Sequence, residues 1–572
     1  MPSLEKWLVD NQATVADGMN RGREPALIGE HQAALLRNVS TRGGKAHSRP
    51  RFVRRMNLPT GKIQGAFVFD STGSLLISVA GRIHEVDPNG WTSVERTSDA
   101  DRNNSQAPRH FYEKTVSSVV IQDGQSKPII YDGANFRRAK DDEVPTGSAM
   151  AYGNGRLAVA INGGSDVRVG DIRKPQHQSE MKFTEWSSLS GGGDFSFSSK
   201  VNSLTYLPVI DTGSGHGPLV VGCKGSVSTL RTQITQRSLW GEVGLGTVLL
   251  PNRGITGSSS VVAVNQDLYF RSSDGLRSLR TSTADYGAPG LSPLSVEVRN
   301  RFDYDTPFLL EDAQVVLFDN RLLVTHTPLV YSNRSMAQGL ISFNFDSLST
   351  RGAKSPPIFD GEWDEMLIAE IAVGEINGVE RCFIVGRDAV GQNALWELLP
   401  ESARLEADSV TSVLETRTLF ADAPGTMKHL RRADMSFSKI VGDLSARIYF
   451  RPNNYPYWIL WDTIASTVSG TQGGWAQIRN QSRSFIQTTQ PMDDIDPQTN
   501  RPFSTSDGFQ VRVEWDGVAQ LDHLQVWQER LDITPFADDL PESVPLLTEP
   551  PSSAVDPSFW YSHAISPLAG IE

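Results

Sequence analysis

The stretch AYGNGRLAVA, residues 151–160, places two short apolar runs on either side of the pair Asn154-Gly155. Asn-Gly readily adopts the positive φ angles of a tight type I′ turn, so the stretch predicts a β-hairpin. Four longer segments repeat this order of apolar run, polar turn and apolar run: VFDSTGSLLISVAGRIHEV (68–86), VVIQDGQSKPIIYDG (119–133), VVAVNQDLYFRSSDGLRSL (261–279) and VVLFDNRLLVTHT (315–327). The recurrence indicates that one hairpin unit is used many times.

Residues 61–400 hold these units, and we expect six or seven of them. A single sheet of three or four strands cannot bury both of its faces. Several such sheets arranged around an axis bury the faces between them, and closure of the ring protects most strand edges. The pattern therefore predicts an all-β fold with a β-propeller of about six or seven irregular blades. An array of β-sandwiches without a ring is the alternative.

Residues 401–531 change in character and predict an antiparallel β-sandwich. The segment GFQVRVEWDGVAQLDHLQVWQERL (508–531) contains two alternating runs with a hinge at Asp516-Gly517. In the first run, apolar residues alternate with Arg512 and Glu514. Such alternation is typical of a strand with one face in the core and one in solvent, so we expect these two side chains to be exposed.

Both ends of the chain are expected as extended arms. Residues 1–60 alternate structure breakers with short apolar pieces. Residues 532–572 contain seven prolines, which exclude a regular core element, but also apolar groups that suit a tail strapped onto a neighbouring subunit or domain.

The chain has 54 basic and 66 acidic residues and a net charge of −12, which disfavours a general nucleic-acid binder. Two distant cysteines give neither a disulfide framework nor a zinc site. The first residues lack the apolar core of a secretory signal, and no apolar run reaches the roughly 18 residues of a membrane span. These features predict synthesis in a reducing cytoplasm and no membrane insertion.

Charge is distributed unevenly along the chain. Residues 37–55, RNVSTRGGKAHSRPRFVRR, carry arginines and a lysine but no acid. This segment suits either a solvated arm or an arm docked on an acidic surface, which a partner subunit or the rest of this chain could supply. The candidate subunit-interface residues are Arg42, Arg49, Arg51 and Arg54 in this segment and Phe559, Trp560 and Tyr561 in the tail.

The sequence shows no recognisable catalytic set. It contains no P-loop, no dinucleotide-binding glycine motif in a strand–helix context and no H-E-x-x-H motif. Its ten histidines do not form local metal-binding pairs. We therefore expect no catalytic residues, no metal and no cofactor, and a protein that is not an enzyme.

One acidic segment keeps a second interpretation open. FDGEWDEM (359–366) places Asp360, Glu362 and Asp364 around Trp363. Paired carboxylates cleave glycosidic bonds, and an aromatic ring among acids could hold a sugar. The alternative function is therefore a propeller-type protein that binds or cleaves glycans on the host surface, although an exposed acidic blade loop also explains the segment.

Several segments in a fixed order resemble a known family. They begin with GMNRGREPALIGEHQAALLRNVSTRGGKAHSRPRF (18–52) and continue with VVIQDGQSKPIIYDGANFRRA (119–139), EVPTGSAMAYGNGRLAVA (143–160), DLYFRSSDGLRSLR (267–280), FDNRLLVT (318–325), RGAKSPPIFDGEWDEM (351–366), NGVERCFIVG (377–386) and LWEL (395–398). Together they resemble the tail nozzle proteins (tail tubular protein B type, or tail hub) of short-tailed bacteriophages. The resemblance covers most of residues 18–400, and the order of the motifs carries it.

The resemblance implies a structural virion protein with a β-propeller and a β-sandwich platform. Six copies would form a homohexameric ring in the phage tail, below the adaptor and portal, with needle, fibre or tailspike proteins as further neighbours. The ring would be a conduit for DNA ejection. An acidic channel wall repels phosphates, so DNA would pass through without specific binding.

Overall fold

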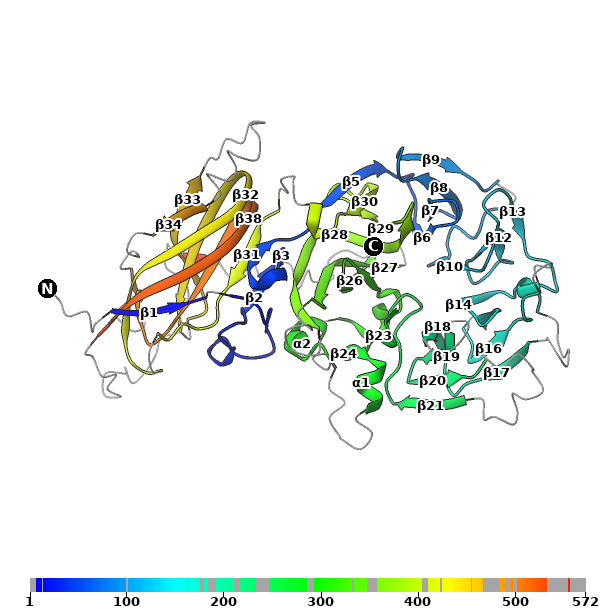
Figure 1. Ribbon diagram of the computed structural model, residues 1–572, viewed down its shortest axis with the longest axis horizontal. Helices are drawn as coiled ribbons and strands as arrows, with labels where there is room; N and C mark the ends of the chain where they lie inside the picture. The colour runs from blue at the N-terminus through cyan, green and yellow to red at the C-terminus, as the bar shows by residue number, and fades with distance from the viewer. Residues whose placement is uncertain are drawn as a thin grey trace, which may run out of the picture. The chain divides into compact units, whose positions relative to one another are not determined.

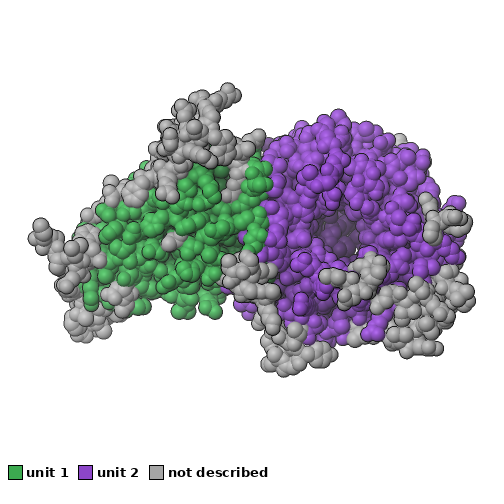
Figure 2. All heavy atoms as spheres, viewed as in Figure 1, with its two compact units in different colours: residues 1–51, 346–363, 401–572 green, residues 52–345, 364–400 purple. Residues whose placement is uncertain are grey.

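The computed structural model describes residues 7–12, 14–98, 101–161, 163–174, 179–183, 192–209, 216–232, 246–284, 293–303, 305–331, 334–346, 357–403, 410–421, 424–453, 455–466, 483–488, 491, 494–496, 501–531 and 554–555. These residues are mostly β-strands, and the α-helices among them are short: α1 (Leu279–Ala284) and α2 (Arg299–Phe302). The chain divides into two compact units (Figure 2). Unit 1 comprises residues 1–51, 346–363 and 401–572, and unit 2 comprises 52–345 and 364–400.

Unit 2 is a β-propeller (Figure 1). Within the described residues its strands form seven antiparallel sheets, which we number as blades 1 to 7. Blades 1 to 4 are β6 (Ile63–Phe69), β7 (Ser74–Val79), β8 (Arg82–Asp87) and β9 (Thr92–Glu95); β10 (Phe111–Lys114), β11 (Val119–Gln122), β12 (Ile129–Tyr131) and β13 (Phe136–Arg138); β14 (Gly147–Gly153), β15 (Arg156–Ile161), β16 (Asp166–Val169) and β17 (Gly193–Ser196); and β18 (Val201–Pro208), β19 (His216–Cys223), β20 (Ser226–Leu230) and β21 (Gly246–Pro251).

The last three blades are less regular. Blade 5 is β22 (Val261–Val264), β23 (Asp267–Ser272) and β24 (Gly275–Ser278); blade 6 is β25 (Val315–Phe318), β26 (Arg321–Tyr331) and β27 (Arg334–Asn344); blade 7 is β28 (Ile358–Ile376), β29 (Val379–Arg387), β30 (Asn393–Leu398) and β5 (Phe52–Asn57). The first strands of blades 1 to 6 touch in sequence, and β29 of blade 7 touches both β25 of blade 6 and β6 of blade 1. The ring is therefore closed, and β5, which precedes blade 1, supplies the outer strand of blade 7.

The blades are held together by side chains that alternate between two interfaces. In β7, Leu75 and Ile77 pack in one cluster with Phe383 of blade 7, whereas Leu76 packs in another with Ile121 of blade 2. Because successive residues of a strand point to opposite faces, one buried strand joins three blades. The prediction of a propeller with six or seven irregular blades is confirmed.

The repeated polar turns have a common physical cause. Asn154 and Gly155 have φ of 53° and 73°, and they join β14 to β15 as the opening stretch predicts. At several other turns an aspartate accepts two backbone N–H groups that would otherwise lack a partner. Asp87, Asp132 and Asp388 each do so, and Asp123 accepts N–H groups of Asn104, Gln125 and Ser126.

Unit 1 is an antiparallel β-sandwich built on two long strands, β32 (Lys428–Pro452) and β38 (Phe509–Arg530), which pair along almost their whole length. Its other strands are β1 (Trp7–Asn11), β2 (Leu35–Arg37), β3 (Val39–Ser40), β4 (Ala46–Ser48), β31 (Ser412–Glu415), β33 (Trp458–Ser466), β34 (Arg483–Gln487), β35 (Ile495–Asp496), β36 (Arg501–Pro502), β37 (Thr505–Ser506) and β39 (Ala554–Val555).

One expectation for the sandwich is wrong. Arg512 and Glu514 were expected in solvent, but both are buried. They form an ion pair with each other, Glu415 lies 3.7 Å from the Arg512 guanidinium, and Tyr449 Oη donates to Glu514 at 3.2 Å. Neighbouring strands supply these partners, so an alternating polar face can be buried without leaving charges unpaired.

The N-terminal residues, expected as an arm, are built into the fold. β1 pairs with β38, β2 with β31 and β4 with β38 in unit 1, and β5 pairs with β30 in unit 2. At the other end, β39 pairs with β33. The other residues of 532–572 lie outside the described part of the chain.

Candidate functional site

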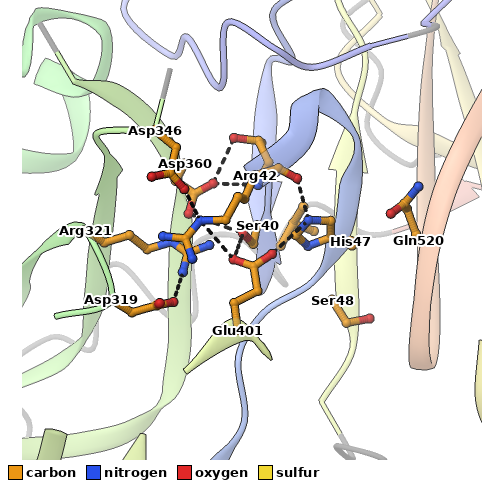
Figure 3. A network of polar contacts seen from close by, with 12 residues as sticks. Ser40, Arg42, His47, Ser48, Asp319, Arg321, Asp346, Asp360, Glu401 and Gln520 are labelled. Atoms are coloured by element: carbon orange, nitrogen blue, oxygen red, sulfur yellow. Dashed lines mark hydrogen bonds and ion pairs between the residues drawn. The ribbon is translucent and has the colours of Figure 1, made fainter. Parts of the chain in front are cut away.

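A buried polar network in unit 1 brings together residues from both sets of sequence candidates (Figure 3). Its centre is Asp360, which is fully buried. The Asp360 carboxylate accepts hydrogen bonds from Thr41 N at 2.5 Å, Thr41 Oγ1 at 2.8 Å and Ser40 Oγ at 3.5 Å. These donors precede the turn η3 (Arg42–Gly44), in which Gly43 and Gly44 have φ of 80° and 78°. The positive φ angles explain the two glycines, because other residues rarely adopt them.

The same turn is held by a second carboxylate, Glu401. Ser40 Oγ donates to Glu401 at 3.2 Å, and His47 Nε2 lies 3.0 Å from Glu401 Oε1 and 2.8 Å from the carbonyl oxygen of Arg42. Both of these atoms are acceptors, so His47 Nε2 carries a proton. Arg42 Nε forms an ion pair with Asp346. The partners in this network all come from the chain itself, so its role is to fix the turn in place.

The other proposed sugar-site residues also lie in β28 rather than on a loop. Glu362 is buried and accepts from Arg21 Nη1 at 2.9 Å, and buried Trp363 donates from Nε1 to the carbonyl of Val39 at 3.0 Å. Asp364, in unit 2, is partly buried, and its Oδ1 lies 3.4 Å from His326 Nε2. Three of the four candidates are therefore turned into the protein, where a glycan cannot reach them.

The basic segment docks on the acidic groups of its own chain. Arg42 pairs with Asp346, and Arg54 Nη2 lies 2.9 Å from Asp388 Oδ2 in unit 2. Arg49 is buried, with Nε donating to Asn38 at 3.1 Å and Nη1 to a backbone carbonyl, and Arg51 is half-buried. Phe559, Trp560 and Tyr561 lie outside the described residues. An interface role for these residues between subunits stays a prediction.

Unit 2 contains a cavity of about 340 Å³, which we call the axial cavity. It lies where the innermost strands of several blades begin, and the space-filling view shows a hollow in the ring of blades (Figure 2). Its lining comprises Pro108, Arg109, Phe111, Ser148, Lys200, Val201, Asn202, Thr256, Gly257, Ser258, Phe308, Leu309, Glu311, Asp312, Val330 and Ser335. The segment η7 (Pro307–Asp312) and the end of the β26–β27 hairpin supply one side.

Most charged atoms of the axial cavity have partners in the chain, but the buried Arg109 Nη1 has none among the described residues. Arg109 Nη2 donates to Ser259 Oγ at 2.6 Å and to Glu370 Oε1 at 2.5 Å, and all but a few per cent of Arg109 is buried. Asp312 Oδ2 accepts from the backbone and hydroxyl of Ser335 at 3.1 and 2.9 Å. Lys200 Nζ and Glu311 Oε1 are 3.0 Å apart on the exposed side. The lining acids are thus engaged by cations or hydroxyls rather than facing each other across a vacant space.

Sequence reasoning missed the axial cavity. Its residues come from blades far apart in the chain, so no local motif brings them together. One signal was present: PFLL at 307–310 is an apolar run outside any hairpin pattern. Among the described residues no three His, Cys, Asp or Glu side chains could hold a metal ion, and no helix there is long and apolar enough to cross a membrane.

Comparisons with known proteins give no family. No family model matches the sequence, and no curated protein matches it. One matching solved structure is described as the crystal structure of RRP9 WD40 repeats. It is 11% identical, the match covers 62% of this chain and 99% of that chain, and the TM-score is 0.36. A similarity of this size carries no argument about function, and the propeller assignment rests on the strand pairing described above.

Proposed function

We propose that this chain is a structural virion protein whose copies form a ring, the nozzle of a short-tailed phage tail. The observation that carries the proposal is the architecture, a closed β-propeller combined with a sandwich of long antiparallel strands in one chain. That combination is what the ordered motifs of residues 18–400 imply. In this function the ring docks below the adaptor and portal and contacts needle, fibre or tailspike proteins.

The chemistry of the two candidate sites supports a scaffold rather than a catalyst. The carboxylates of Asp360 and Glu362 accept hydrogen bonds from N-terminal residues and hold them in place. Arg109 joins two blades through its ion pair with Glu370. Breaking such a buried pair is costly because it leaves a charge without a partner. These contacts stiffen each unit, as a conduit under internal pressure requires.

The charge balance suits passage of DNA. With a net charge of −12, a channel formed by several copies repels phosphates, so DNA slides without specific binding. We therefore expect the purified protein not to bind duplex DNA at moderate ionic strength, as measured by a filter-binding assay.

The first test is the solution mass of the full chain, measured by light scattering at several concentrations and followed by electron microscopy. A ring of about six copies with an open centre supports the proposal. A chain that stays monomeric at all concentrations, and that binds a glycan array, contradicts it and favours the alternative function on the host surface.

A further inference from the structure

The rim of the axial cavity exposes large apolar side chains. Phe308 is 76% exposed and Val330 is 62% exposed, and both line the cavity. Leu329, the neighbour of Val330 in β26, is 42% exposed. β26 and β27 pair through Val330↔Ser335 to the end of the hairpin, so this apolar rim is held on regular structure. Leu329 points to the opposite face of β26 from Val330, so the rim itself is formed by Phe308 and Val330. Exposed apolar groups beside a concave site mark an interaction surface.

The polar groups around this rim narrow the class of partner. Glu370 engages Arg109 Nη2 and Ser335 engages Asp312, whereas the buried Arg109 Nη1 has no hydrogen-bond partner among the described residues. The cavity therefore offers a partner apolar area, the Arg109 Nη1 donor, and at its exposed side the ion pair of Lys200 and Glu311, which carries one charge of each sign. This favours a protein partner that inserts an apolar side chain flanked by both a base and an acid.

Unit 1 carries a surface feature of that kind, which we call the Leu27 turn and define as residues 22–30. Leu27 is 65% exposed at the end of η2 (Pro25–Leu27), whereas Ile28 beside it is buried. The turn is fixed by hydrogen bonds from Leu27 N to Glu24 O at 2.8 Å and from Thr418 N to Pro25 O at 3.0 Å. Because the Leu27 turn is already ordered before binding, it loses little conformational entropy when it binds.

The charges beside Leu27 complement those at the cavity. Arg23, Glu24 and Glu30 are exposed within the Leu27 turn. A base can therefore meet Glu311 while an acid meets Lys200. Because both surfaces are on one polypeptide and differ from each other, the contact between copies would be heterologous, the type that closes into rings.

We propose that the Leu27 turn of one copy of this chain docks at the mouth of the axial cavity of a second copy. The proposal rests on the self-assembly in the proposed function and names the surfaces that perform it. Leu27 enters between Phe308 and Val330, and the flanking charges set the orientation.

One test compares charge insertions at matched exposed positions. Leu27→Asp and Phe308→Asp place a charge in the contact, whereas Ile495→Asp and Val390→Asp do so at side chains that are 58% and 87% exposed elsewhere on the same units. By light scattering we expect the first two variants to weaken self-association at least about tenfold and the controls less than about twofold.

A second test traps the contact covalently and does not depend on a loss of assembly. The native cysteines, Cys223 and Cys382, are buried, so introduced thiols react selectively. A Leu27→Cys chain is mixed with a Phe308→Cys chain under mild oxidation. We expect a disulfide-linked heterodimer on a non-reducing gel, and none from Ile495→Cys mixed with Val390→Cys.

The results separate this inference from the proposed function. If the wild-type chain forms rings but the Leu27→Asp and Phe308→Asp variants do so equally well and no heterodimer is trapped, the docking proposal is wrong and the ring stands. If the wild-type chain stays monomeric and no heterodimer is trapped, the docking proposal is wrong, and binding of the same chain to a glycan array then contradicts the ring as well. Trapping with another partner protein but not between copies also overturns the second-copy proposal.

Discussion

Glu113 offers a pH-dependent test of how blades 2 and 3 pack. It lies on β10, and its Oε1 accepts a hydrogen bond from Tyr152 N on β14 at 2.9 Å. Burial raises the pKa of Glu113 from 4.5 to about 8, and the Tyr152 hydrogen bond opposes this only in part. The perturbation is Glu113→Gln, which keeps an acceptor for Tyr152 and removes the titration.

The direction of the pH dependence follows from the pKa of Glu113 in the unfolded chain and in the folded protein. Between pH 4.5 and about 8 the folded protein keeps the Glu113 proton while the unfolded chain releases it. Unfolding is therefore favoured as pH rises through this window, so the stability is full below pH 4.5 and is lost by about pH 8. At about 1.4 kcal/mol per pH unit the difference gives at most about 5 kcal/mol. Since Glu113 is only partly buried by surface area, solvent screening reduces our expectation to roughly 2–3 kcal/mol.

The assay is urea unfolding followed by tryptophan fluorescence at pH 5, 7 and 9, with both proteins measured in parallel. We expect the free energy of unfolding of the wild-type chain to fall relative to Glu113→Gln across this range by roughly 2–3 kcal/mol. Two curves that stay parallel from pH 5 to 9 would refute the burial of a protonated Glu113 between the blades.

Three further outcomes are expected. Asp123→Ala removes the acceptor of three backbone N–H groups, so thermal unfolding should show a loss of about 1–2 kcal/mol, whereas the exposed Asp141→Ala should change stability by less than about 0.5 kcal/mol. Gly18→Ala puts a Cβ 2.2 Å from the Phe359 carbonyl oxygen at φ +74°, so it should cost more than about 2 kcal/mol, while Gly43→Ala at φ +80° has open space and should cost about 1 kcal/mol; equal losses in urea titrations would contradict this. Glu362→Gln weakens the pair with the N-terminal residues and should lower stability by about 2 kcal/mol without changing ring formation, and a selective loss of glycan binding instead would revive the sugar site.

The propeller could be predicted because its signals are local. A turn such as Asn154-Gly155 and its flanking apolar runs lie within ten residues, and each blade repeats that arrangement. Blades of three or four strands then have few ways to bury both faces. The same local reasoning gave the sandwich from the alternation in 508–531.

The parts that could not be predicted depend on pairing over long distances. β1 pairs with β38 about five hundred positions away, and a five-residue strand has no periodicity that reveals its partner. Asp360 resembled a surface acid because its donors, Ser40 and Thr41, lie more than three hundred residues earlier. The apolar rim at Phe308 was overlooked for the related reason that exposure is a property of the assembled blades.

The strand β5 places a condition on synthesis. It leaves the ribosome before any blade, but its partner β30 ends at Leu398, and β1 must wait for β38 near residue 530. At about 5–20 residues per second, β1 waits roughly 25–100 seconds for its partner. A chain that terminates before residue 398 can complete neither unit, and one that terminates before about residue 530 cannot complete unit 1, so a truncated product should present unpaired strand edges to the cell's proteases rather than join a ring as a defective copy.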